Sequence, residues 1–277
     1  MPFAAIDGHQ IFYTDSGGEG LPVLVFSHGL LMDHSMFDPQ VAALQAHYRC
    51  IAWDERGHGQ TAQPGHCPPF SYYDSANDLV ALLDHLGVPQ AVLVGMSQGG
   101  YLSLRCALTH PERVQALVLI DTQALPEDPA LMPQHMALVQ HWAQHGLNDE
   151  MAATVESFIL GEGWEGAQAW KAKWQQVDTA NLIQCFTTLG QRDDISDKIA
   201  QIQVPALVMH GTQDRAIAPQ RAQAMAHSLP HAQWVDIAGA GHAPNLTHPV
   251  PVNAALQAFL AQVLPAPAGR PSMAGLA

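Results

Sequence analysis

The segment GMSQG, residues 95–99, places a serine between two glycines at the end of an apolar run. It matches G-x-S-x-G, in which a strand enters, a helix leaves and the serine occupies the sharp turn between them. Gly95 and Gly99 leave out side chains that would collide in so tight a turn. The hydroxyl would lie at a helix N-terminus, where developing negative charge is favoured. We therefore predict that Ser97 is a nucleophile rather than a structural turn residue.

A serine hydroxyl is a weak nucleophile unless a base takes its proton, so a histidine and an orienting acid are expected elsewhere in the chain. On this kind of elbow they follow in the order serine, acid, histidine. The segment HGTQD ends at Asp214, just beyond an apolar run, and GAGH ends at His242, just beyond the last such run. We predict Asp214 as the acid and His242 as the base.

The chain has 16 histidines and several further acids, so other residues are alternatives for the same roles. Asp121 also ends an apolar run and is the alternative acid, but it precedes a long helical segment. No strand leads directly into His248, and His110 stands before a proline at a predicted helix end. Asp193 and Asp194 fall inside the helical segment.

Hydrolysis of an ester passes through a tetrahedral oxyanion, which backbone N–H groups can stabilise by roughly 3–4 kcal/mol. One donor should be the residue after the nucleophile, Gln98. The other should come from the loop after an early strand, where Leu30 follows His28 and Gly29. The alternative for this loop is an ordinary turn at a strand end.

Composition excludes several classes of function. The 277 residues are 48% apolar, which is enough for a substantial core, and the formal net charge is −14. So acidic a surface repels phosphate backbones and anionic lipid, so we expect no nucleic-acid partner and no membrane partner. The four cysteines show no metal-ligand spacing, and Cys50 and Cys106 lie in apolar segments as small core residues. We expect no metal and no organic cofactor, because no HExxH, P-loop or GxGxxG stands in a suitable context.

The N-terminus lacks the charged and apolar regions of a signal peptide, and no apolar stretch approaches the roughly 20 residues that span a bilayer. We expect a cytoplasmic protein. The tail, residues 265–277, is rich in Pro, Ala and Gly and is predicted to be disordered.

Apolar runs alternate with helical patterns along most of the chain, which favours an α/β fold with a doubly wound, mostly parallel sheet. The predicted strands are 21–29, 49–57, 91–97, 115–122, 205–212 and 233–239, and the predicted helices are 75–87, 98–111, 221–229 and 251–264.

Residues 123–198 break this alternation, because they carry helical patterns and no convincing strand. We interpret them as a helical cap over one end of the sheet, with 1–122 and 199–264 forming the core. Trp142, Phe158 and Trp164 in this cap are candidates for lining the substrate pocket, although a tryptophan-rich helical stretch is more often ordinary core.

Five segments together resemble the α/β-hydrolase fold superfamily over roughly residues 3–264. They stand in that superfamily's order: FSHGLLMDHSMFDPQ, IAWDERGHGQT, the Ser97 elbow, HGTQD and GAGH. Within it, the chain is most similar to capped bacterial serine esterases and lactonases of the group that contains 3-oxoadipate enol-lactonases and cofactor-free haloperoxidases. The resemblance implies Ser97, Asp214 and His242 as the triad and Leu30 and Gln98 as oxyanion donors.

Two departures bear on the substrate. Gln98 stands where enol-lactonases usually have methionine, and HGLL replaces their shorter oxyanion loop. DERGHG, residues 54–59, is a landmark of the fold, and Arg56 and His58 are predicted to be structural.

The expected activity is hydrolysis of a small-molecule ester or lactone through an acyl-enzyme. The alternatives are a carbon–carbon bond hydrolase, a perhydrolase, a peptidase that holds an amine with cap carboxylates, and a ligand receptor without catalysis. The cap carboxylates in question are Glu150, Glu156, Glu162 and Glu165.

Overall fold

An eight-stranded sheet runs through residues 2–264, the part of the chain that this computed structural model describes. Its strand order is β1-β2-β4-β3-β5-β6-β7-β8, and the six strands from β4 to β8 are parallel. All six predicted strands are present, with ends that differ from the predicted ones by up to four residues. The bounds are β3 (Val23–Ser27), β4 (Arg49–Trp53), β5 (Ala91–Met96), β6 (Val114–Ile120), β7 (Ala206–Gly211) and β8 (Ala232–Ile237).

The first two strands were not predicted. β1 (Phe3–Ile6) and β2 (His9–Asp15) form an antiparallel hairpin, and β2 adds antiparallel to β4. Asp7 and Gly8 make its two-residue turn, with φ of 44° and 81°. An Asp-Gly pair between two short strands is the usual sequence signal of such a hairpin.

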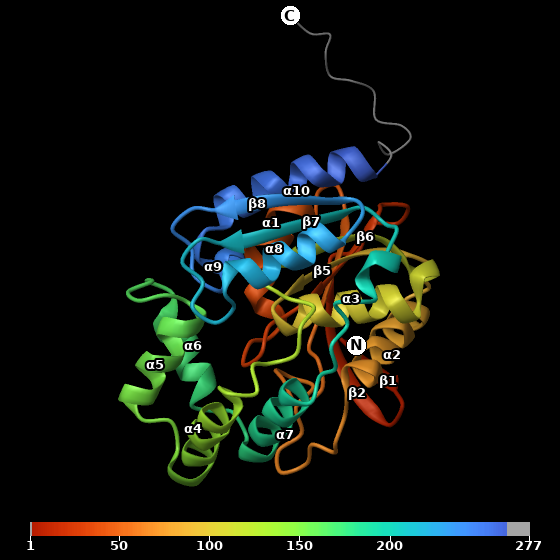
Figure 1. The fold of residues 1–277 in the computed structure, drawn as a ribbon. Helices are drawn as coiled ribbons and strands as arrows, with labels where there is room; N and C mark the ends of the chain where they lie inside the picture. The colour runs from red at the N-terminus through yellow and green to blue at the C-terminus, as the bar shows by residue number, and fades with distance from the viewer. Residues whose placement is uncertain (1, 265–277) are drawn as a thin grey trace, which may run out of the picture.

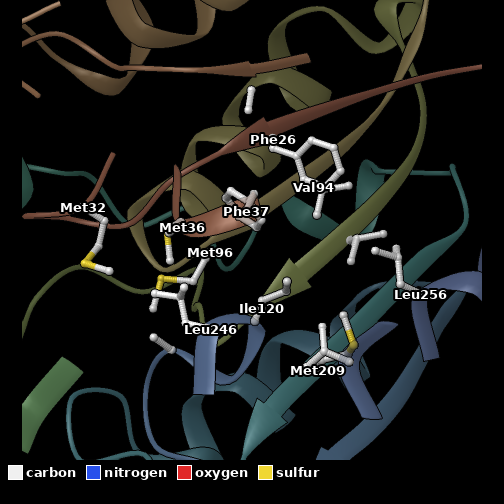
Figure 2. Close-up of a cluster of buried hydrophobic side chains, with 14 of the residues drawn as sticks. Phe26, Met32, Met36, Phe37, Val94, Met96, Ile120, Met209, Leu246 and Leu256 are labelled. Atoms are coloured by element: carbon white, nitrogen blue, oxygen red, sulfur yellow. The ribbon is translucent and has the colours of Figure 1, made fainter. Parts of the chain in front are cut away.

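Helices cover both faces of the sheet (Figure 1). One face packs against α1 (Asp38–Leu44) and α10 (Pro249–Val263), the other against α2 (Tyr72–His85), α3 (Gln98–Thr109) and α8 (Pro219–Ser228). Because side chains alternate along a strand, Phe26 joins the first hydrophobic cluster and its neighbour Val25 joins the second. In the first cluster, which Figure 2 shows in part, the ring of Phe26 lies 5.1 Å from that of Phe37.

The four predicted helices are present, with ends that differ from the predicted ones by up to three residues. α2 begins three residues earlier than predicted, because Ser71 and Asp74 form a capping box at its start. α1 was not predicted. It has only seven residues and follows a 3₁₀ turn, η1 (His34–Phe37), which Asp33 caps.

Between β6 and β7 the chain forms four helices and no strand: α4 (Met132–His145), α5 (Asp149–Ile159), α6 (Ala167–Trp174) and α7 (Thr179–Gly190). They gather at one end of the molecule, away from α10 (Figure 1). Trp142, Trp170 and Trp174 are at most 5% exposed and belong to the first hydrophobic cluster, which is therefore continuous from the sheet into the cap.

Several other expectations concern single residues or segments. Cys50 and Cys106 are buried core thiols, as predicted. No helix within residues 2–264 has both the length and the apolar character that crossing a membrane requires. The tail predicted to be disordered, 265–277, lies outside the described residues.

Candidate active site

Ser97 stands on the turn between β5 and α3, with φ of 53° and ψ of −117°. For a residue with a side chain this backbone conformation is strained, and such strain is typical of functional sites. The flanking glycines make the turn possible. A Cβ on Gly95 would lie 2.2 Å from the carbonyl oxygen of Gly99, and a Cβ on Gly99 would lie 2.1 Å from that of Ser27.

The structure brings the three predicted triad side chains together. Ser97 Oγ lies 3.0 Å from His242 Nε2, and His242 Nδ1 lies 2.9 Å from Asp214 Oδ2. A carboxylate only accepts hydrogen bonds, so Nδ1 carries the proton and Nε2 is free to accept one from the serine. These three groups come from three separate loops at the carboxyl ends of β5, β7 and β8.

The loop after β7 holds Asp214 firmly. Its Oδ1 accepts the backbone N–H groups of Ala216 and Ile217 at 2.8 and 3.1 Å. Burial by itself would raise the pKa of this carboxyl. The charges of His242 and His210 and these hydrogen bonds outweigh burial and hold the pKa below its usual value. Asp214 is therefore the anion of the site.

Asp121, the alternative acid, is fully buried next to Asp214. Its Oδ1 accepts the backbone N–H of Gly211 at 2.9 Å, and its other contacts are to His210 and Asp214 rather than to His242. Burial and the neighbouring charge of Asp214 raise its pKa well above the usual value. Both effects favour the neutral form of Asp121, and its carboxyl makes no contact with His242.

The loop after β3 forms a turn that exposes a backbone donor. Met32 N donates to Gly29 O at 3.1 Å, so Leu30 and Leu31 are the two central residues. Leu31 has φ of 62°, at a position where this type of turn usually has glycine. The turn bond leaves the N–H of Leu30 unused. A Cβ on Gly29 would lie 3.5 Å from Cβ of Ser97, so the turn lies against the nucleophile.

Gln98 is the first residue of α3, and the first N–H groups of a helix have no partner within it. The structure therefore places both predicted oxyanion donors, Leu30 and Gln98, beside Ser97.

The buried side chain of His28 is hydrogen-bonded to the turn that contains Leu30. Its Nε2 accepts the backbone N–H of Glu55 at 3.0 Å, so the proton resides on Nδ1, which donates to Gly29 O at 2.8 Å. Burial lowers the pKa of His28, which keeps the ring neutral. His58 packs its ring 4.8 Å from His28, and burial lowers its pKa to about 3. His58 and Arg56, which forms an ion pair with Asp78, are internal contacts of the fold.

The cap contacts the same turn through α6. Trp174 Nε1 donates to Leu31 O at 2.9 Å, and the Trp174 side chain is fully buried. Next to it, Lys173 Nζ lies 2.7 Å from both Asp33 Oδ2 and Ser35 Oγ. The strained residue of the oxyanion turn is thus held by a hydrogen bond from the cap.

Two cavities lie between the cap and the core. One, of about 670 Å³, is lined by Leu31 and Met32 and by α6 and α7. The other, of about 440 Å³, is lined by Gly241, beside His242, and by the cap loop that carries Trp164. Of the three aromatic candidates, Trp164 thus lines a cavity. Trp142 is 3% exposed and packs into the cap interior, so the interpretation of Trp142 as a substrate-lining residue is corrected to core. Phe158 is 40% exposed and faces Arg215.

Two groups of carboxylates and histidines have the spacing of metal ligands: Asp33, His34 and Asp54, and Asp121, His210 and Asp214. In the first, His34 N and Nδ1 bind Asp54 Oδ1 and Gln60 N binds Oδ2. In the second, Asp214 is the acid that contacts His242. The internal contacts of each group explain its arrangement without a cation.

Comparisons with known proteins show the family of the chain. Residues 22–249 match the α/β-hydrolase fold family. The chain belongs to this family. It is 27% identical to 3-oxoadipate enol-lactonase 2 of Acinetobacter baylyi, over 90% of this chain and 92% of the relative. It is 32% identical to a non-heme chloroperoxidase of Streptomyces lividans, over 92% and 97%. A thermophilic esterase from Thermogutta terrifontis superposes with a TM-score of 0.83 at 28% identity, covering 95% of this chain and 97% of the esterase. The chain is therefore a hydrolase of this fold, as the five sequence segments predicted.

Two residues near the site were missed from the sequence. Glu55 lies inside DERGHG, a segment from which only Arg56 and His58 were predicted to have structural roles. Trp174 was one of several cap tryptophans. Neither has a local signal, because the contact of each is made to a segment far away in the chain.

Proposed function

We propose that this hydrolase cleaves carboxylic esters or lactones through an acyl-enzyme on Ser97. The observation that carries the proposal is the continuous chain of hydrogen bonds from Ser97 Oγ through His242 to Asp214, at 3.0 and 2.9 Å. Its substrates would be small molecules that fit between the cap and the core.

The mechanism follows from the positions of these groups. His242 Nε2 accepts the proton as Ser97 Oγ attacks the carbonyl, and Asp214 stabilises the imidazolium that forms. The oxyanion accepts hydrogen bonds from Leu30 N and Gln98 N. Protonated His242 then gives its proton to the leaving alcohol. Water, deprotonated by the same nitrogen, hydrolyses the acyl-enzyme and restores Ser97.

The similar proteins carry different names, and each name suggests a different substrate. The 3-oxoadipate enol-lactonase supports a lactone, and the esterase supports an open-chain ester. The chloroperoxidase supports a second candidate, in which hydrogen peroxide replaces water in the second step and a peracid leaves. A carbon–carbon bond hydrolase would use the same serine, histidine and acid.

A substrate panel tests the proposal. The wild-type protein, Ser97→Ala and the control Ser228→Ala, which changes an exposed serine on α8, are assayed with p-nitrophenyl esters of increasing chain length and with simple lactones. We expect turnover by the wild type and the control, and a loss of at least about 10³-fold in Ser97→Ala. Retained activity in Ser97→Ala would exclude Ser97 as the nucleophile. Bromide oxidation with peroxide and acetate, measured in parallel, would favour the perhydrolase.

A further inference from the structure

A buried polar group lies beside the oxyanion donors and takes no part in the mechanism above. Glu55, in the loop after β4, is 3% exposed, and its Oε2 accepts a hydrogen bond from Gln98 Nε2 at 2.7 Å. Gln98 is 1% exposed, and its Oε1 accepts from Tyr72 Oη at 3.3 Å. Side chains from three separate segments thus meet directly behind the first residue of α3.

The same residue contacts the other half of the oxyanion hole. The backbone N–H of Glu55 donates to His28 Nε2 at 3.0 Å, and His28 Nδ1 donates to Gly29 O at 2.8 Å. Gly29 O also accepts the N–H that closes the turn around Leu30. The backbone N–H of Glu55 therefore connects, through His28, to the turn that contains Leu30 N. The Glu55 side chain connects to Gln98, which carries the other donor.

We propose that Glu55 is a positioning residue of the oxyanion hole, which fixes the spacing of its two backbone donors through His28 on one side and Gln98 on the other. The proposal rests on the proposed function, since it concerns the same oxyanion. Donors act only when they are held at the place where charge develops, and a displacement of a fraction of an ångström weakens them.

The protonation state of Glu55 gives the proposal a measurable signature. Burial raises the pKa of the Glu55 carboxyl to about 7. A hydrogen bond with the Ser75 hydroxyl of α2 and the charge of Arg56 oppose this rise, and the charge of Asp78 adds to it. Tyr72 from α2 and Cys185 from α7 also face the carboxyl.

A negative charge on Glu55 would oppose the oxyanion that forms next to Gln98. We therefore expect kcat/KM of the wild type to fall as the pH rises through about 7. An amide at position 55 keeps an acceptor for Gln98 and cannot ionise.

The test measures kcat and KM for a neutral p-nitrophenyl ester between pH 5.5 and 9, with circular dichroism at each pH. Three variants are compared with the wild type: Glu55→Gln, Glu55→Leu and the control Glu112→Gln, which changes an exposed acid far from the site. At pH 6 we expect Glu55→Gln to stay within about twofold of the wild type. Glu55→Leu should lose on the order of tenfold in kcat with little change in KM.

The alkaline side of the profile decides the proposal even if Glu55→Leu fails to fold. We expect the fall above pH 7 in the wild type and in Glu112→Gln, and its absence in Glu55→Gln. The same fall in Glu55→Gln as in the wild type, or no fall in the wild type, would overturn the proposal while ester turnover continued. A folded wild type without turnover on any ester or lactone would instead contradict the proposed function itself.

Discussion

The two sides of Ser97 each contain a buried carboxyl close to the reacting groups, and the pKa values of the two carboxyls shift in opposite directions. On the acid side, the interactions with His242 and His210 and the backbone hydrogen bond from Ile217 hold the pKa of Asp214 below its usual value despite burial. On the oxyanion side, no histidine contacts the Glu55 carboxyl, and burial raises its pKa to about 7.

The comparison shows that partners decide what burial does to an acid. Desolvation favours the neutral form of both carboxyls, and only the one with an adjacent imidazole overcomes it. The outcome suits the chemistry, because a negative charge stabilises the imidazolium on one side and would oppose the oxyanion on the other.

The largest expected effect separates Asp214 from its neighbour Asp121. Asp214→Asn should lower kcat by about 10³- to 10⁴-fold, because an amide can hold His242 in the tautomer that cannot accept the serine proton. Asp121→Asn should lower it by less than about tenfold, because Asp121 does not contact His242 and its raised pKa favours the neutral form that an amide resembles. Steady-state kinetics on one ester measures both. The reverse order of effects would make Asp121 the acid.

A smaller effect is expected where the cap holds the oxyanion turn. Trp174→Phe keeps an aromatic ring in the buried site but removes the N–H that binds Leu31 O. We expect kcat to fall by about three- to tenfold with KM nearly unchanged, because the strained turn relaxes and moves the Leu30 donor. Leu31→Gly, which removes the strain at φ of 62°, should recover part of the loss in the double variant. If KM rises and kcat is unchanged, Trp174 contacts substrate and does not position the turn.

Stability should depend on pH in opposite directions at the two carboxyls. The folded-state pKa of Asp214 is lowered, so its contribution is present above the unfolded value and is lost as pH falls through the folded one. The folded-state pKa of Glu55 is raised, so its contribution is complete at low pH and is lost as pH rises through about 7.

Thermal unfolding of single variants measures these contributions. The melting temperature of Glu55→Gln minus that of the wild type should increase by at least about 2 °C as the pH rises from 6 to 8.5. Asp214→Asn should be less stable than the wild type at pH 7, with the difference shrinking only below about pH 4. A constant difference between Glu55→Gln and the wild type across the range would mean that Glu55 does not titrate there.

The sequence predicted the parts of this molecule that have local signals. The parallel strands were visible as apolar runs, and the elbow was visible because its glycines must leave space on both sides of Ser97. The hairpin β1–β2 was missed although Asp7 and Gly8 carried its turn signal, because its strands lie at the sheet edge and are only partly apolar.

The contacts around the oxyanion hole could not be read in this way. Glu55, Tyr72 and Gln98 meet only after β4, α2 and α3 have packed together, and no spacing in the chain announces it. Gln98 gave the one hint, as a polar residue where the similar enol-lactonases usually have methionine. Its partner could be found only in three dimensions.

Covalent labelling of the nucleophile tests the central claim most directly. A fluorophosphonate reacts with a serine that a neighbouring histidine activates, and mass spectrometry of the digested protein locates the adduct. We predict one adduct per chain, on the peptide that contains Ser97, no adduct in Ser97→Ala, and strongly slowed labelling in His242→Ala. An adduct on any other serine, or an unlabelled wild type that is folded, would contradict the assignment of Ser97 as the nucleophile.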